Sequence, residues 1–223
     1  PHHLPARATR TGGIFLLMYV VLSVSSFKFC VTRYAFRVIL PSMSPRIVIV
    51  GAGFVGTQTA TLLAKRLRRK AEIILISPQE TFCFLPRLID ALADPHVPKH
   101  WLERPLARLA KREGFSFVRG SVLSVDRKKN VVAYKKFGAQ KNSSLVYDVI
   151  VLCPGARTAF FDIPGANAYA FPLKCAEDVI RIHAKTDALL TQAADATNDR
   201  ERRALLSFAV VGAGPSGVES LFA

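Results

Sequence analysis

The sequence predicts an α/β protein built around a parallel β-sheet, and three observations support this fold class. An unbroken run of β-branched residues, Ile47–Val50, leads directly into a glycine-rich turn. A helical stretch and a second apolar run, Ile73–Ile76, follow that turn. A third apolar run, Leu206–Val211, leads into a similar turn near the end of the sequence. Strands that are covered on both faces of a parallel sheet have such continuous apolar runs.

The first glycine turn has the spacing G-x-G-x-x-G, and it consists of Gly51, Ala52, Gly53, Phe54, Val55 and Gly56. In such turns the first glycine permits the tight bend and the second lets the backbone approach a pyrophosphate. The third glycine lets the following helix lie close to the strand. We expect this helix to run from Thr57 to about Arg69, with the N–H groups at its start directed at the pyrophosphate. The strand–turn–helix–strand frame therefore predicts a dinucleotide site, against the alternative of an ordinary glycine-rich turn.

The end of the second strand departs from the usual dinucleotide-binding pattern. An Asp or Glu normally lies there and accepts hydrogen bonds from the ribose hydroxyls. This chain has Ser77, followed by Pro78. A serine hydroxyl can make one hydrogen bond to the ribose but lacks the charge, and Glu80 is a second candidate for the same role.

Further elements are expected in order between the two turns. We predict a short amphipathic helix over 101–114, followed by short strands that are joined by a polar turn at 127–130. An apolar strand over 149–153 should meet a tight turn at Pro154–Gly155, and a connector should follow over 161–174. The last elements expected before the second turn are a helix over 175–196, a charged turn over 198–203 and a strand over 206–211.

The second glycine turn consists of Gly212, Ala213, Gly214, Pro215, Ser216 and Gly217. It lies too far along the chain from the first turn for the two to be repeats of a solenoid. We therefore expect two dinucleotide sites in one chain. This combination has a chemical meaning, because one bound cofactor can give a hydride to the other where their reactive rings meet.

The composition narrows the possible partners. The formal net charge of +15 favours contact with nucleic acid, anionic lipid or phosphorylated cofactors. No zinc-finger spacing, aromatic RNA-binding consensus or basic zipper accompanies the charge, so we expect no nucleic-acid partner. The basic groups at 65–70 and 127–129 are interpreted as a solvated helix end and a strand turn, with weak attraction to a membrane surface as the alternative.

Cysteine and histidine spacing argues against a dithiol or metal centre. The four cysteines are Cys30, Cys83, Cys153 and Cys175, and none of them forms a close pair. This pattern favours a reducing compartment. His96 and His100 are four residues apart, but Pro98 lies between them, and we expect no metal site.

Residues 1–42 are an uncertain N-terminal extension. The run Ile14–Leu22 is apolar, but a membrane-spanning helix needs about 20 such residues. Met43 lies just before the first predicted strand. We therefore interpret residues 1–42 as upstream sequence or a fragment artefact, with a targeting segment or an N-terminal anchor as the alternatives.

Taken together, these motifs resemble those of the pyridine-nucleotide-dependent flavoprotein reductases with two dinucleotide-binding domains. Within that group the sequence is most similar to the type II NADH dehydrogenases, which pass electrons from NADH through FAD to a quinone. The resemblance covers residues 46–220 and is carried by RIVIVGAGFVG (46–56), ILISPQETFCFLPRLIDAL (74–92), YDVIVLCPGARTAFFDIPGA (147–166), FPLKCAEDVIRI (171–182) and FAVVGAGPSGVES (208–220).

The resemblance implies an FAD site around the first glycine turn. The three glycines of that turn would hold the FAD pyrophosphate, and Ser77 would lie at the adenosine ribose. Leu85–Pro86 match the segment that reaches the flavin, and the backbone of Val122 would meet the adenine. Pro154–Gly155 match a turn beside FAD that usually reads Thr-Gly, so the threonine hydroxyl contact is missing here.

The resemblance also implies an NADH site around the second glycine turn, whose glycines would receive the NADH pyrophosphate. Glu219 matches a family glutamate near the contact between nicotinamide and flavin, and it is the candidate catalytic residue. The alternative is a glutamate that the helix dipole stabilises. The residue that selects between NADH and NADPH is expected beyond the end of the sequence.

The expected fold is thus a Rossmann-like FAD/NAD(P)-binding fold with a parallel sheet, a small antiparallel β element and a truncated second nucleotide-binding domain. We expect residues 43–165 to form an incomplete FAD-binding domain and residues 166–223 to begin an NAD(P)H-binding domain. The chain resembles an N-terminal piece of a longer enzyme.

The function expected from this resemblance is that of an FAD-dependent oxidoreductase, which takes a hydride from NADH onto the flavin and passes electrons to an acceptor, expected to be a quinone. The alternatives are a soluble ferredoxin- or rubredoxin-type reductase and a non-catalytic truncated dinucleotide-binding module. A sulfide:quinone oxidoreductase is disfavoured, because it would need a cysteine pair close to the flavin. We expect a cytoplasmic location, with peripheral contact to the inner face of a membrane and a homodimer as further possibilities for the full-length protein.

Overall fold

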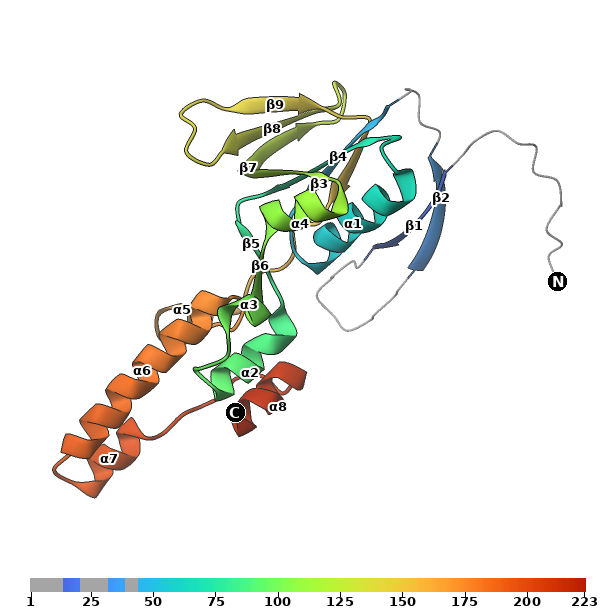
Figure 1. The fold of residues 1–223 in the computed structure, drawn as a ribbon. Coiled ribbons are helices and arrows are strands. Elements are labelled where there is room, and N and C mark those ends of the chain that lie inside the picture. The colour runs from blue at the N-terminus through green and yellow to red at the C-terminus, as the bar shows by residue number, and fades with distance from the viewer. Residues whose placement is uncertain (1–13, 21–31, 39–43) are drawn as a thin grey trace, which may run out of the picture.

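The structure is a computed structural model that describes residues 14–20, 32–38 and 44–223 (Figure 1). Strands β1 (Ile14–Val20) and β2 (Thr32–Val38) pair in antiparallel fashion. The remainder of the predicted extension over 1–42, and Met43 after it, lie outside the described residues. Within the described ranges, no helix combines the length and apolar character needed to cross a membrane.

A six-stranded sheet with the order β10-β3-β4-β7-β8-β9 forms the larger lobe of the molecule (Figure 1). The strands β10, β3, β4 and β7 run parallel, whereas β8 and β9 are antiparallel to their neighbours. The strands are β3 (Arg46–Val50), β4 (Glu72–Ser77), β7 (Ser116–Asp126), β8 (Val131–Lys136), β9 (Ser143–Val146) and β10 (Val149–Leu152). The predicted α/β fold with a parallel sheet and a small antiparallel β element is confirmed.

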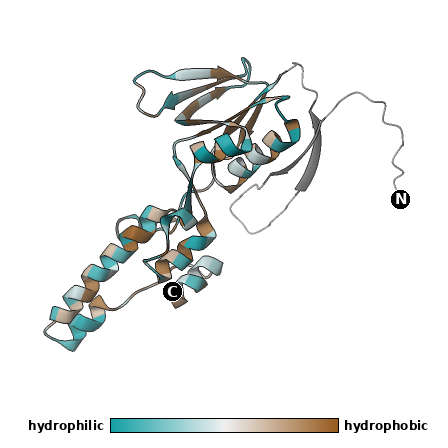
Figure 2. Ribbon diagram, viewed as in Figure 1, coloured by the Kyte–Doolittle hydropathy of each residue, from teal (hydrophilic) through white to brown (hydrophobic). Residues whose placement is uncertain are grey.

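Different elements pack against the two faces of this sheet. Helices α1 (Phe54–Leu67) and α4 (Leu106–Glu113) lie on one face, where Ile49 and Leu75 are completely buried. On the other face, Val48 and Ile74 pack against apolar residues of the curled strands β7 to β9. Figure 2 shows that apolar residues concentrate in the central strands. Parallel strands covered on both faces require such residues, which explains the unbroken apolar runs in the sequence.

The segment between β4 and β7 contains several short elements. They are β5 (Thr81–Cys83), the 3-10 helix η1 (Leu85–Arg87), α2 (Leu88–Ala93), α3 (Lys99–Leu102) and β6 (Glu103–Pro105). Strands β5 and β6 form a two-stranded antiparallel pair. The predicted single helix over 101–114 is wrong at its start, because the helix that ends there begins only at Leu106. Pro105 disfavours a helical conformation in the residue before it and cannot donate a helical hydrogen bond.

A smaller helical lobe contains α5 (Ala166–Tyr169), α6 (Ala176–Asp195), α7 (Asp199–Leu205) and α8 (Pro215–Phe222) (Figure 1). Its core joins α2, α3 and the start of α6 through Leu88, Ala91, Leu102 and Val179. The His183 ring nitrogen Nε2 lies 2.9 Å from the Leu92 carbonyl oxygen, which adds a polar contact between α6 and α2.

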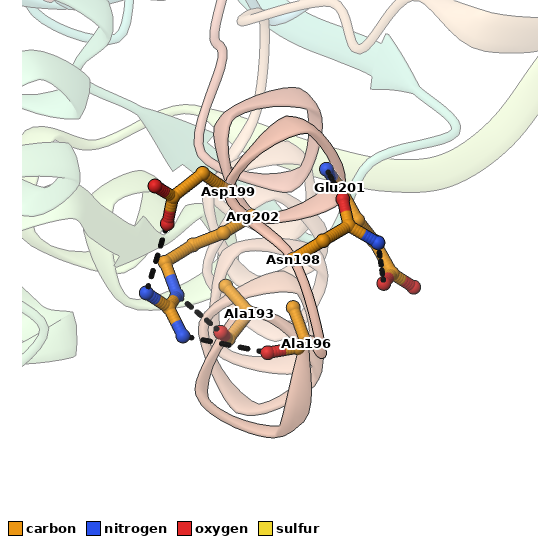
Figure 3. Close-up of polar contacts among 6 residues, drawn as sticks. All are labelled: Ala193, Ala196, Asn198, Asp199, Glu201 and Arg202. Carbon is orange, nitrogen blue, oxygen red and sulfur yellow. Dashed lines mark hydrogen bonds and ion pairs between the residues drawn. The ribbon is translucent and has the colours of Figure 1, made fainter.

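The charged turn predicted over 198–203 is wrong, since these residues belong largely to helix α7. Asn198 caps its start by accepting a hydrogen bond from the Glu201 N–H at 2.9 Å. Arg202 donates from Nε to the Ala193 carbonyl oxygen and from Nη2 to that of Ala196, at 3.3 and 3.4 Å (Figure 3). The charged side chains therefore fold into a short helix that caps the end of α6.

The strand predicted over Leu206–Val211 is also wrong, because this segment is not a strand. A strand requires a hydrogen-bonded neighbour, and no segment in the described part of the chain forms a ladder with these residues. Their apolar side chains remain exposed, with Val211 at 91%. Helix α8 nevertheless forms after the second glycine turn, and it lies against α2.

Candidate dinucleotide-binding site

The first glycine turn lies at the carboxyl edge of three parallel strands. Gly51 follows β3 directly and has a φ angle of 98°. Its N–H donates to the Ile76 carbonyl oxygen of β4 at 2.8 Å. On the other side, the Cys153 N–H after β10 donates to the Val50 carbonyl oxygen at 2.7 Å. The turn is thus anchored between both neighbours of β3.

Two glycines of this turn are required by close backbone contacts. A Cβ atom on Gly51 would overlap the carbonyl oxygen of Cys153, and one on Gly56 would overlap the carbonyl oxygen of Gly51. In contrast, a Cβ atom on Gly53 would meet no atom within 4 Å. The middle glycine therefore borders open space, where a ligand can approach the backbone.

Helix α1 presents an uncapped N-terminus to this space. Its first hydrogen bond is donated by the Thr57 N–H to the Gly53 carbonyl oxygen at 3.0 Å, and no side chain caps the helix start. The N–H groups of Phe54, Val55 and Gly56 therefore lack helical acceptors. Such groups, together with the positive end of the helix dipole, form a site for an anion such as a pyrophosphate.

Both candidates for ribose recognition already have polar partners. Ser77 is the last residue of β4 and is completely buried, and its hydroxyl donates to Gln79 Oε1 at 2.7 Å. The carboxylate of Glu80 accepts a hydrogen bond from Arg119 Nη1, also at 2.7 Å. Neither residue alone supplies the uncommitted carboxylate that usually binds a ribose.

An aromatic group places the 84–86 segment next to helix α1. The ring of Phe54 lies 5.1 Å from that of Phe82 and 5.4 Å from that of Phe84, between ring centroids. Leu85–Pro86 follow immediately in η1. Phe54, Phe84 and Leu85 are each about two-fifths exposed, at 42%, 38% and 39%. Sequence reasoning missed this aromatic contact, although the alternation of Phe82 and Phe84 was a signal for it.

The other expected residues of the first site border the same edge. Pro154–Gly155 follow β10 and are adjacent to the glycine turn through Cys153. Val122 lies farther along β7, where that strand has left β4 and pairs with β8. The structure thus brings the first turn, Ser77, Leu85–Pro86 and Pro154–Gly155 to one edge, with Val122 on the bordering strand.

The second glycine turn has the same local geometry as the first. Gly212 has a φ angle of 118°, and a Cβ atom on Gly217 would overlap the Gly212 carbonyl oxygen. A Cβ atom on Gly214 would meet nothing within 4 Å, and no side chain caps the start of α8. This turn forms although the segment before it is not in a sheet. Between the described residues, no hydrogen bond connects the two turns.

Three further predicted residues lie on α8. Pro215 occupies the first helical position, which suits a residue without an N–H donor. Ser216 is exposed, and its carbonyl oxygen accepts a hydrogen bond from Ser220 Oγ at 2.7 Å. Glu219 is exposed and lies beyond the first helical turn, which contains no acidic residue. Because dipole stabilisation falls off within one turn, it does not account for Glu219.

The cysteines near these elements are electrostatically unsuited to nucleophilic chemistry. Burial, followed by the nearby Glu103 carboxylate, raises the pKa of Cys83 to about 11. Burial and the acidic side chains at the start of α6 raise the pKa of Cys175 to about 11. Burial alone raises the pKa of Cys153. In the described part of the chain, no group of three or more histidine, cysteine or acidic residues is arranged to hold a metal ion.

Sequence comparison finds relatives among mitochondrial oxidoreductases. The chain is 33% identical to the External NADH-ubiquinone oxidoreductase 2 of Saccharomyces cerevisiae, over 78% of this chain and 32% of that protein. It is 27% identical to the External alternative NAD(P)H-ubiquinone oxidoreductase B4 of Arabidopsis thaliana, over 80% of this chain and 31% of that protein. The chain therefore spans about a third of the length of these relatives.

Structural comparison agrees. NDH2 from Plasmodium falciparum, solved in complex with NADH, superimposes with a TM-score of 0.68 at 25% sequence identity. The match covers 79% of this chain and 36% of that one. The sequence profile of the pyridine nucleotide-disulphide oxidoreductases matches residues 45–221, which include both glycine turns. This chain belongs to the pyridine nucleotide-disulphide oxidoreductase family.

Proposed function

We propose that this chain is the part of an NADH:quinone oxidoreductase that binds FAD and begins the nicotinamide site. The observation that carries the proposal is the pair of glycine turns with matching backbone geometry, each with open space beside its middle glycine. A single turn of this kind is consistent with many nucleotide-binding proteins. Two such turns in one chain fit an enzyme that binds two dinucleotides.

The first turn and α1 would hold the FAD pyrophosphate through the backbone N–H groups that have no helical acceptor. The exposed apolar side chains of Phe54, Phe84 and Leu85 would bind the flavin side of the molecule. Gly155, with a φ angle of 72°, would let the backbone pass close to the cofactor. The chemistry that a flavin would supply when held by these residues is hydride acceptance from a nicotinamide and onward transfer of the electrons.

The second turn and α8 would hold the pyrophosphate of NAD(P)H at the equivalent place with fewer free donors, because Pro215 has no N–H and the Gly217 N–H donates to the Gly214 carbonyl oxygen at 3.0 Å. Glu219 extends from the helix that begins at this turn, and we assign it a catalytic role near the nicotinamide. In this proposal residues 43–165 form the FAD-binding domain, and residues 166–223 begin the NAD(P)H-binding domain.

A quinone is the proposed electron acceptor because the relatives from S. cerevisiae and A. thaliana are both named ubiquinone oxidoreductases. A quinone dissolves in the membrane, so peripheral contact of the whole protein with a membrane follows from the same proposal. A soluble electron-carrier protein as acceptor is the competing outcome, and it is distinguished by comparing a soluble quinone with ferredoxin in assays of the purified protein.

Two matched valine substitutions test the proposed sites. Gly53 and Gly214 both have negative φ angles and space for a side chain, so each variant should fold normally. Gly53→Val should weaken FAD binding by roughly 10- to 100-fold through lost backbone contacts to phosphate, and leave NADH binding unchanged. Gly214→Val should have the reverse effect. Flavin fluorescence measures the first affinity and calorimetry the second.

The outcomes separate the proposal from its alternatives. A purified protein with no affinity for FAD would refute the proposal. Bound FAD that NADH does not bleach would favour the non-catalytic nucleotide-binding module. Equal losses of FAD and NADH affinity in both valine variants would show that the turns do not act as two separate sites.

A further inference from the structure

Arg119 occupies a position that sequence motifs did not identify. It is the last β7 residue paired with β4, and its partner in the parallel register is Ser77. In dinucleotide-binding folds, the adenosine ribose lies at the end of the strand to which Ser77 belongs. Arg119 is therefore adjacent to the place where the adenosine half of a bound FAD should lie.

The Arg119 side chain is fixed by contacts from two residues in loops outside β7. Its guanidinium carbon lies 3.7 Å from the ring centroid of Phe137, and its Nη1 donates to the Glu80 carboxylate at 2.7 Å. The backbones are linked as well, since the Phe137 N–H donates to the Arg119 carbonyl oxygen at 2.9 Å. Ring and carboxylate thus set both the position and the plane of the guanidinium.

The same arrangement leaves one donor of Arg119 unsatisfied. Its Nε atom is buried and has no hydrogen-bond partner among the described residues. A buried donor without an acceptor is unfavourable, so hydrogen bonding alone does not account for this side-chain conformation. About a third of the side chain, 35%, remains exposed to solvent. The cluster therefore presents part of a planar group in a fixed orientation.

We infer that Arg119 is the platform on which the adenine of FAD stacks. The adenine would cover the guanidinium from the side opposite Phe137. A guanidinium stacks well on aromatic rings and bases. Glu80 neutralises the charge, so the group is suited to a neutral base rather than to an additional phosphate. This inference rests on the proposed function, because it assumes that the first turn binds FAD.

Stacking on Arg119 also accounts for the missing acidic residue at the end of β4. The Ser77 hydroxyl is engaged with Gln79, and Glu80 is engaged with Arg119. The usual charged contact to the ribose is therefore replaced here by a contact to the base. The base would then be held on β7, the strand on which the resemblance also places the adenine at Val122.

Three ligands that share parts of FAD test this inference. ADP contains the adenosine and pyrophosphate without the flavin, whereas FMN contains the flavin without the adenosine. Arg119→Met should lower the affinity for FAD and ADP by about tenfold, which is the loss expected for one base stack. The affinity for FMN should not change. Arg119→Lys should not restore binding, because lysine keeps the positive charge but lacks the planar guanidinium group on which the base would stack.

Arg181→Met is the matched control. Its guanidinium lies 5.5 Å from the Phe171 ring centroid in the helical lobe, so the variant removes a similar contact elsewhere. It should bind all three ligands as the unsubstituted protein does. Fluorescence titration measures FAD and FMN, and calorimetry measures ADP.

The results distinguish failure of this inference from failure of the proposed function. Unchanged FAD and ADP affinities in Arg119→Met would overturn the inference, as would an equal loss of FMN affinity. If Arg119→Met does not fold, Phe137→Leu replaces it, since this variant keeps the ion pair with Glu80. It should lower FAD and ADP affinity about threefold through the loss of ring support, and unchanged affinities would overturn the inference. If the unsubstituted protein binds no FAD, the proposed function itself fails.

Discussion

Gly56 and Gly217 meet the same steric demand in different surroundings. In each turn a Cβ atom at the third glycine would overlap the carbonyl oxygen of the first, at Gly51 and Gly212 respectively. These contacts lie within a few residues of sequence, which explains why the motif predicts the turn so reliably. The positions that depend on distant segments, such as Arg119, could not be predicted in this way.

Gly56→Ala should destabilise the protein by roughly 1–3 kcal/mol, because the new methyl group collides with backbone that is held by neighbouring strands. Gly53→Ala is the control, since its methyl group would meet no atom within 4 Å. Urea unfolding at neutral pH measures both changes. An equal effect of the two substitutions would contradict the steric assignment.

Cys83 and Cys175 should react very slowly with iodoacetamide at neutral pH. Both pKa values are raised to about 11, so the thiolate form becomes abundant only as the pH approaches that value. Mass spectrometry of alkylated peptides across pH 7–10.5 gives the rates. Urea-unfolded protein should react much faster at pH 8, and equally fast labelling of the folded protein would show that these thiols are not shielded.

The sequence correctly predicted the helices and strands that are marked by a local pattern of residues. It was wrong where the conformation depends on contacts with segments far away in the chain. The apolar runs correctly predicted β3, β4 and β10. Helix α7 was missed because its many charges suggested a turn, although Asn198 with Glu201 three residues later is a helix-start signal. The segment 206–211 was predicted as a strand from its apolar residues, but composition alone supplies no ladder partner.

Helices α1 and α4 are joined by an ion pair whose strength should depend on pH. Glu113 accepts contacts from Lys65 Nζ at 3.0 Å and Arg112 Nε at 2.8 Å, and these hold the pKa of Glu113 below its usual value of 4.5. A lowered pKa contributes stability above pH 4.5, and that contribution is lost as the pH falls through the folded-state value.

Glu113→Gln should therefore lower the free energy of unfolding at pH 7 but have a much smaller effect near pH 3. Urea unfolding of both proteins at the two pH values measures the difference. Glu72→Gln, which changes the exposed ion pair of Arg46 on the sheet, is a comparison for general charge effects. A Glu113→Gln effect that does not change with pH would show that the ion pair is not its cause.

Asn198→Ala should weaken helix α7 by about 1 kcal/mol through the loss of its N-terminal cap. The change should appear as faster hydrogen exchange in α7 and at the end of α6, where Arg202 contacts the carbonyl oxygens. Arg200→Ala, on the same exposed helix, should have little effect. Equal exchange in both variants would argue against the capping role.

Across the molecule, the sequence correctly predicted the α/β architecture of the larger lobe. It did not predict how the helical lobe is assembled, because α2, α6 and α8 meet through contacts between residues far apart in the chain. The same reason applies to the Arg119–Phe137 contact, which depends on the register of β7 and β8. Local sequence patterns determine individual strands, turns and helices, whereas the arrangement of these elements in space depends on tertiary packing.

Hydrogen exchange should differ strongly between the two segments that precede the glycine turns. Amides of β4 and β3 lie in the middle of the sheet and should exchange slowly. Amides of residues 208–211 have no ladder partner within the described ranges and should exchange close to the rate of an unfolded peptide. Strong protection of 208–211 at high protein concentration would indicate that the segment pairs with another strand, for example from a second copy of the chain.

The second turn keeps its shape although no strand in the described part of the chain pairs with the residues before it, and this has a practical consequence for protein engineering. Among the described residues no strand pairs with the segment before this turn, so its backbone conformation depends mainly on residues 209–222 and on the contact of α8 with α2. A segment this short is suitable for transplantation onto the start of an unrelated helix. There it would supply a ready-made cradle for phosphate without the need to rebuild a sheet around it.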